Sequence, residues 1–110
     1  TNFIGAYFKT TQFNHTNLNY ANFSDSTLKQ VTFENCELIE SLFQTCTFSK
    51  IEFRHTNINL ANFWGTNLKG IDFSNTEFDA IEVTLDQLNG IQINALQAGV
   101  FARLLGIKII

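Results

Sequence analysis

The chain has 110 residues, of which 45% are hydrophobic, and this is enough for one domain with a buried core. A formal net charge of −3 and only 15% charged residues argue against a basic nucleic-acid-binding protein, and no apolar run approaches the roughly 18 residues of a membrane span. The first residues also lack a secretory signal pattern. We therefore expect a soluble cytoplasmic protein, and because the chain contains no Met, we expect that residues precede Thr1.

Large apolar residues recur at every fifth position from Phe3 to Val83. All seventeen positions of this column are Phe, Leu, Ile or Val, and eleven of the twelve Phe residues lie in it. A second column, two residues earlier, is small or β-branched throughout. Alternation along an extended segment points both columns to one side, but a straight strand would reverse the side after five residues. The repeat therefore predicts a coil that turns a corner in every pentapeptide, with both columns inside.

A longer repeat fixes the number of sides of this coil. The segment 15–23 reads HTNLNYANF and the segment 55–63 reads HTNINLANF. Over residues 15–38 and 55–78, twelve of twenty-four residues are identical at an offset of forty. Forty residues make two turns of four pentapeptides but no whole number of three-sided turns. We predict an all-β solenoid with a square coil of twenty residues over residues 1–85, the coils stacked about 4.8 Å apart.

Residues 86–110 follow a different pattern. The register fails after Val83, because Asp86 stands where a small inward residue is expected. Asn94 is a good N-cap, residues 95–105 are predicted to be helical, and Gly106 suits the position after a helix. Residues 107–110 are predicted to form a short strand. The tail is interpreted as a cap on the last coil that also dimerises, through Leu96, Val100, Phe101, Leu104, Leu105, Ile107 and Ile109.

No group of residues predicts catalysis. Cys36 and Cys46 lie in the inward small column and are expected to be core thiols. His15 and His55 share one corner two coils apart, about 10 Å, which is too far to bind one metal ion. We expect no enzyme activity, no cofactor and no metal.

Charged residues are divided between the walls of the predicted coil. Two adjoining walls carry most of the acids, namely Glu34, Glu37, Glu40, Glu52, Asp72, Glu77 and Asp79. Another wall carries Lys9, Lys29, Lys50 and Lys69. This pattern is explained equally by solubility and by a surface that imitates the phosphates of a DNA duplex.

The motifs A-N-F at 21–23 and 61–63 and T-N-L at 16–18 and 66–68 resemble the pentapeptide repeat family, whose motif is A(D/N)LXX. The resemblance covers residues 1–85 and implies a right-handed quadrilateral parallel β-helix. The tail, with G-I-Q-I at 90–93 and L-G-I-K-I at 105–109, is similar to the C-terminal end of Qnr-type quinolone-resistance proteins in that family.

The Qnr-type resemblance implies a function. It implies a homodimer joined through the C-terminus that binds type II topoisomerase, DNA gyrase or topoisomerase IV, as a DNA mimic and protects it from fluoroquinolones or toxins. Family members often carry projecting loops that are needed for protection, and residues 1–85 contain no such insertion. The alternative is a non-enzymatic scaffold for another protein, with Trp64, Tyr20 and Leu60 exposed on its surface.

Overall fold

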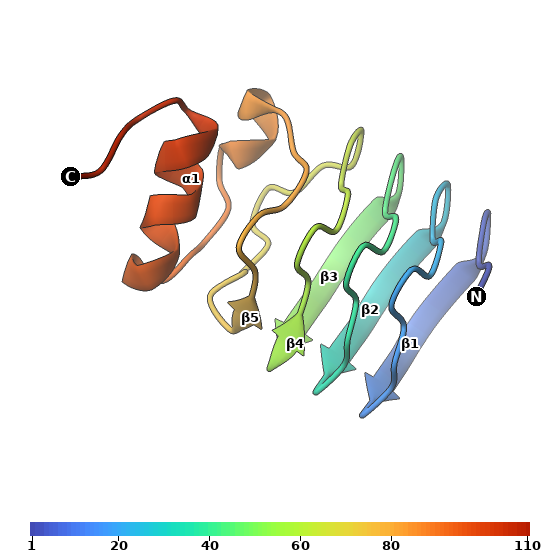
Figure 1. Ribbon diagram of the computed structural model, residues 1–110. Coiled ribbons are helices and arrows are strands. Elements are labelled where there is room, and N and C mark those ends of the chain that lie inside the picture. The colour runs from blue at the N-terminus through green and yellow to red at the C-terminus, as the bar shows by residue number, and fades with distance from the viewer.

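The protein is a rod of stacked coils with helices at its C-terminal end, and the computed structural model describes all of residues 1–110 (Figure 1). Its extents are 43 × 26 × 22 Å. Three strands, β1 (Tyr7–Asn14), β2 (Thr27–Glu34) and β3 (Thr47–Arg54), form a parallel sheet in that order. Two short strands, β4 (Thr56–Asn57) and β5 (Thr76–Glu77), form a second parallel sheet. The predicted solenoid is therefore confirmed.

The coil repeats every twenty residues on each wall. Phe13 pairs with Phe33 and Phe33 pairs with Phe53 in the β1–β3 sheet. Isolated parallel bridges at the same offset join the coils elsewhere, such as Asn22 with Leu42. The square coil predicted from the forty-residue repeat is correct.

The corners of the coil lie at the position two residues after each large apolar centre. Every fifth residue from Gly5 to Gly70 has a positive φ, and eleven of these residues are not glycine. Just before the centre, the repeated Asn accepts a hydrogen bond from the backbone two residues later, as in Asn22 Oδ1 with the N–H of Ser24 at 2.9 Å. This Asx turn explains why the A-N-F and T-N-L motifs carry Asn.

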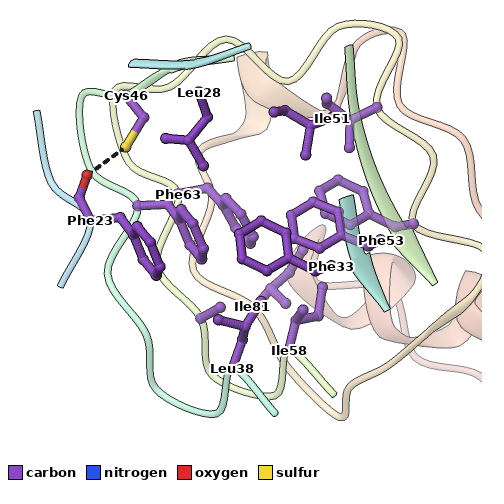
Figure 2. Packing of buried hydrophobic residues seen from close by; sticks show 14 of the residues in the cluster. Phe23, Leu28, Phe33, Leu38, Cys46, Ile51, Phe53, Ile58, Phe63 and Ile81 are labelled. Carbon is purple, nitrogen blue, oxygen red and sulfur yellow. Dashed lines mark hydrogen bonds between the residues drawn. The ribbon is translucent and has the colours of Figure 1, made fainter. Parts of the chain in front are cut away.

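Two ladders of Phe rings fill opposite sides of the core (Figure 2). Within each ladder the rings stack, with 4.8 Å between the centroids of Phe23 and Phe43 and 5.4 Å between those of Phe33 and Phe53. Across the core the ladders meet edge to face, with an interplanar angle of 85° between Phe23 and Phe33. Both arrangements are favoured by the aromatic quadrupole. The large inward column predicted from the sequence is therefore the core.

The small inward column also joins the coils by hydrogen bonds. Thr66 Oγ1 accepts from the N–H of Cys46 at 2.9 Å and donates to the carbonyl of Phe43 at 2.5 Å. In the neighbouring coil, Cys46 Sγ donates to the carbonyl of Phe23 at 3.1 Å (Figure 2). Because buried polar groups need partners, Thr66 satisfies two backbone groups that have no backbone partner, while Cys46 adds a second donor to a carbonyl that already accepts from the N–H of Ser26.

Backbone pairing between coils continues beyond residue 85, where the sequence places the end of the solenoid. Asp72 bridges to Gln92, and the N–H of Phe73 donates to the carbonyl of Gln92 at 2.8 Å. Two 3₁₀ turns, η1 (Leu85–Leu88) and η2 (Ala95–Gln97), replace the regular corners of this last coil. The division of the chain at residue 85 thus falls inside a coil.

The C-terminal helix is shorter than predicted. The α-helix α1 spans Ala98–Leu104 and follows η2, and Asn94 caps η2 by accepting a hydrogen bond from the N–H of Gln97. Gly106 has the positive φ expected after a helix. Residues 107–110, predicted to form a short dimerisation strand, are exposed and form no strand pairing with another segment of the single chain (Figure 1), so their pairing with a second copy stays a prediction.

No helix of the structure combines the length and apolarity needed to cross a membrane.

Candidate functional site

The carboxylates of the seven predicted acidic residues differ in burial and in ion pairing. Glu52 pairs with Arg54 at 2.9 Å, and both side chains are 56% exposed. Glu34 is half-buried, and its Oε2 is buried without a hydrogen-bond partner. The other five are exposed and form no salt bridge; they are Glu37, Glu40, Asp72, Glu77 and Asp79. The structure therefore leaves the wall centred on Glu37 and Glu77 more strongly negative than the adjoining one.

This acidic wall contains β4 and β5. Its outward residues Glu37, Asn57 and Glu77 lie in register on successive coils. Coils about 4.8 Å apart place the two glutamates about 10 Å from each other, with the amide of Asn57 between them. Neither carboxylate accepts a hydrogen bond from the chain or meets a cation. Both are therefore free to bind a cationic partner.

The lysines lie on another wall. Lys9 and Lys29 are neighbours in register on β1 and β2. Lys29 Nζ lies 5.8 Å from the centroid of the Tyr7 ring, a cation–π contact. None of the lysines forms a salt bridge with an acid. The lysine charges are thus not neutralised within the molecule.

Two adjoining hollows run along the acidic wall to the C-terminal helices. One, of about 460 Å³, is lined by Glu37, His55, Asn57 and Glu77 among others. The second, of about 450 Å³, lies where β5 meets η2 and α1. They share Asn57, Thr76 and Glu77. We call the second hollow the terminal groove, and its lining residues are Asn57, Asn59, Thr76, Glu77, Phe78, Asp79, Asn94, Leu96, Gln97 and Val100.

The residues predicted for dimerisation divide into two groups. Phe101 is buried and packs edge-on against Phe78, with 5.7 Å between the ring centroids. It closes the core of its own protomer and is not available to a second copy. The exposed members are Leu96, Leu104, Leu105, Ile107 and Ile109, while Val100 is half-buried.

The polar residues of the core and corners form no reactive site. Cys36 and Cys46 are free and buried, as predicted. Burial raises the pKa of the Cys46 thiol above its ordinary value, which disfavours the reactive thiolate. No group of three or more His, Cys, Asp or Glu side chains is arranged to hold a metal ion.

The terminal groove and two inward glutamines were not predicted from the sequence. Gln87 Nε2 donates to the carbonyls of Phe63 at 2.6 Å and Thr66 at 2.7 Å. Gln97 Nε2 donates to the carbonyls of Phe73 at 2.8 Å and Thr76 at 3.0 Å. The signal was the shared spacing of T-L-D-Q at 84–87 and N-A-L-Q at 94–97, which are capping boxes ten residues apart.

Solved structures of similar fold come from several sources. A pentapeptide repeat protein of the Arabidopsis thaliana thylakoid lumen is 18% identical, with a TM-score of 0.53, covering 94% of this chain and 89% of that one. QnrB1, a plasmid-mediated fluoroquinolone resistance protein, is 17% identical with a TM-score of 0.40, covering 98% and 91%. HetL, involved in heterocyst differentiation regulation in Nostoc sp. strain PCC 7120, is 13% identical with a TM-score of 0.39, covering 68% and 35%. These likenesses concern the fold alone.

Sequence comparison gives a firmer assignment. No curated protein sequence matches the chain. The family model described as pentapeptide repeats (8 copies) matches residues 1–35 and 36–75, which is more than half of the chain and agrees with the twenty-residue coils and their Asn turns. The chain belongs to the pentapeptide repeat family.

Proposed function

We propose that the protein is a non-enzymatic DNA mimic that binds a type II topoisomerase, with DNA gyrase as the first candidate, and protects it from fluoroquinolones or gyrase-targeting toxins. The observation that carries the proposal is the acidic wall, where Glu37 and Glu77 project from a rigid sheet without counter-ions. The resemblance of the tail to Qnr-type proteins supports the choice of partner. The solved-structure likenesses add nothing to that choice.

A DNA mimic needs fixed negative charge, because a DNA-binding channel recognises phosphates by position. The acidic wall satisfies this requirement, since backbone pairing between coils fixes the spacing of its side chains. Its charge also lies on a different wall from Lys9 and Lys29, so a basic partner surface meets little repulsion. The proposal includes a homodimer joined through the exposed tail residues that lie outside the terminal groove, Leu104, Leu105, Ile107 and Ile109, and a cytoplasmic location.

The test is a gyrase supercoiling assay with a fluoroquinolone, with and without the protein. Protection predicts that more drug is needed to halve supercoiling when the protein is present. A heat-denatured sample is the control for added protein. An unchanged drug response, together with no binding of gyrase at low salt, would contradict the proposal.

A second candidate is a scaffold that binds another protein through apolar contacts. Its support is three large exposed side chains, with Tyr20 67%, Trp64 55% and Leu60 40% exposed. Apolar contacts are not weakened by salt, whereas binding through the acidic wall is screened. Binding that persists at 0.5 M salt (about a 4 Å screening length) and is lost in Trp64→Ser would favour the scaffold.

A further inference from the structure

The terminal groove combines an apolar floor with an acidic rim. Phe78 and Val100 are half-buried in it, and Leu96 stands at its edge with 94% of its surface exposed. Glu77 and Asp79 lie on the same lining, and no Lys or Arg does. The side chains of both acids accept no hydrogen bond from the chain. Arg103 Nη2 donates to the backbone carbonyl of Asp79 at 3.4 Å but forms no ion pair with either carboxylate, so the groove offers apolar contact and unpaired negative charge side by side.

The exposure of Leu96 is not required by the turn that carries it. The two 3₁₀ turns have the same capping box and the same inward glutamine. In η1 the residue equivalent to Leu96 is Asp86, which is exposed, and the residue equivalent to Ala95 is Leu85. A polar residue thus serves the turn equally well at this position. Unlike the exposed Leu85 of the first turn, Leu96 lines one groove with Phe78 and Val100, and a contiguous apolar patch of this kind points to contact with a ligand.

The charge of the groove limits what that ligand is. A purely apolar segment would desolvate Glu77 and Asp79 without compensation, which is unfavourable. A purely cationic segment would leave Leu96 and Val100 exposed to water. A segment that places an apolar side chain beside an Arg or Lys satisfies both halves of the groove. Arg is the better match, because its guanidinium binds carboxylates in a forked geometry.

We propose that the terminal groove binds a protein segment in which an apolar side chain is flanked by arginine or lysine. This inference rests on the proposed function, in which a basic protein surface lies along the acidic wall, and it names the place where such a partner is anchored. The apolar side chain packs between Leu96 and Val100, and the flanking cation pairs with Glu77 or Asp79.

The test uses defined peptides and ¹⁵N-labelled protein. Three capped pentapeptides are compared: one with leucine between two arginines, one with serine in place of the leucine, and one with glutamines in place of the arginines. The first is expected to shift the amide signals of Asn59, Glu77 and Leu96. It is expected to bind at least about tenfold more tightly than the serine peptide, since burial of one leucine is worth that much. It is expected to bind at least about tenfold more tightly than the glutamine peptide, because that peptide has no cation to pair with the acids.

Three variants locate the site. Leu96→Asp copies the residue of the first turn, so it keeps the fold and is expected to weaken the leucine peptide about tenfold. The pair Glu77→Gln and Asp79→Asn is expected to remove the advantage of arginine over glutamine. Leu85→Ala copies the second turn and is the matched control, because Leu85 is 61% exposed but lies outside the groove.

The outcomes separate this inference from the proposed function. Equal binding of the leucine and serine peptides, or unchanged affinity in Leu96→Asp, would overturn the groove while leaving a charge-based acidic wall intact. Absence of any signal shift at millimolar leucine peptide would overturn it as well. Binding of the leucine peptide together with failure of the gyrase assay would keep the groove and require a different basic partner.

Discussion

Cys46 occupies a place in the core where the neighbouring coils have Ser26 and Thr66. All three side chains connect one coil to the preceding one by donating to a carbonyl twenty-three residues earlier. The sequence predicts that these residues are small and inward, because the column requires it. It does not predict their hydrogen bonds, since a small side chain in this column can also be alanine, as Ala21 and Ala61 show on another wall.

We predict that Cys46→Thr changes the free energy of unfolding by less than about 1 kcal/mol, because a hydroxyl in that position makes the same contacts in Thr66. Cys46→Ala is expected to lose about 1–3 kcal/mol, since the carbonyl of Phe23 keeps only the N–H of Ser26 as a donor and a small void remains. Urea denaturation of the two variants checks this. Equal stability of both would show that the hydrogen bond is unimportant.

The parent protein and the Cys46→Thr variant also give a test of pH dependence. The pKa of Cys46 is raised in the folded state, chiefly by burial, so the unfolded chain loses this proton first as pH rises. Stability from the group is therefore complete below the ordinary thiol pKa of about 8.5 and declines above it. Cys46→Thr is expected to be less destabilised than the parent between pH 8 and about 10. An identical pH profile for both would contradict the burial of the thiol.

At the scale of the elements, the two 3₁₀ turns end the solenoid. In each turn the inward position passes from the second residue to the third, so Gln87 and Gln97 turn inward while Asp86 and Leu96 turn outward. The glutamine amides then donate to carbonyls that the next coil would otherwise satisfy. The turns thus end the hydrogen-bond ladder without a further coil, which an open solenoid end requires.

Replacing Gln97 with Leu is expected to lower the free energy of unfolding by about 1–3 kcal/mol, because the carbonyl of Thr76 loses its donor, while that of Phe73 keeps the N–H and hydroxyl of Thr76. Gln92→Leu is the matched control, since Gln92 is exposed and its side chain makes no hydrogen bond. Thermal or urea unfolding measures the difference. Equal stability of the two variants would show that Gln97 is not a structural cap.

The periodic elements were predictable, and the elements that break the period were not. Five-residue spacing fixes which side chains face inward, and the forty-residue repeat fixes the number of walls. In η1 and η2 the inward position is shifted by one residue, and hydrophobic spacing does not reveal this shift. The spacing therefore predicts that Leu96 lies in a helix at residues 95–105. Six of the seven acids are exposed, but the half-burial of Glu34 and the pairing of Glu52 with Arg54 depend on side-chain rotamers that spacing does not reveal.

At the scale of the whole molecule, the rod separates acids from lysines. Charge reversal at Glu37 and Glu77 together, both to Lys, is expected to abolish gyrase binding, because the two lysines offset Glu40 and Asp79 and the wall loses its net negative charge. The melting temperature is expected to stay unchanged, since both side chains are exposed and unpaired. Pull-down of gyrase by the tagged protein, with calorimetry alongside, measures both.

The matched control reverses Lys29 and Lys69 to Glu. This pair changes the net charge by an equal amount in the opposite direction, on another wall, and is expected to leave binding intact. Equal loss in both pairs would indicate a non-specific charge effect. Loss only in the lysine pair would move the binding surface to the opposite side of the rod.

The exposed tail gives a further prediction about the whole molecule. Leu104→Glu is expected to convert a dimer to a monomer, because Leu104 is 40% exposed beside Leu105 and Ile107, and a charge there would be desolvated at an apolar contact. Leu85→Glu, on the distant turn, is the control. Light scattering at tens of micromolar decides the question, and a monomeric parent protein would contradict the proposed dimer.

The twenty-residue register between coils also determines which deletions keep the side chains of the rod in line. Removing twenty residues, such as one complete coil between residues 21 and 40, shortens the rod and returns every later side chain to the same wall. Removing five residues between Glu37 and Glu77 keeps every corner conformation but turns all later coils by a quarter turn. Glu77 would then no longer lie in line with Glu37. A deletion therefore keeps the remaining side chains aligned between coils only if its length is a multiple of four pentapeptides.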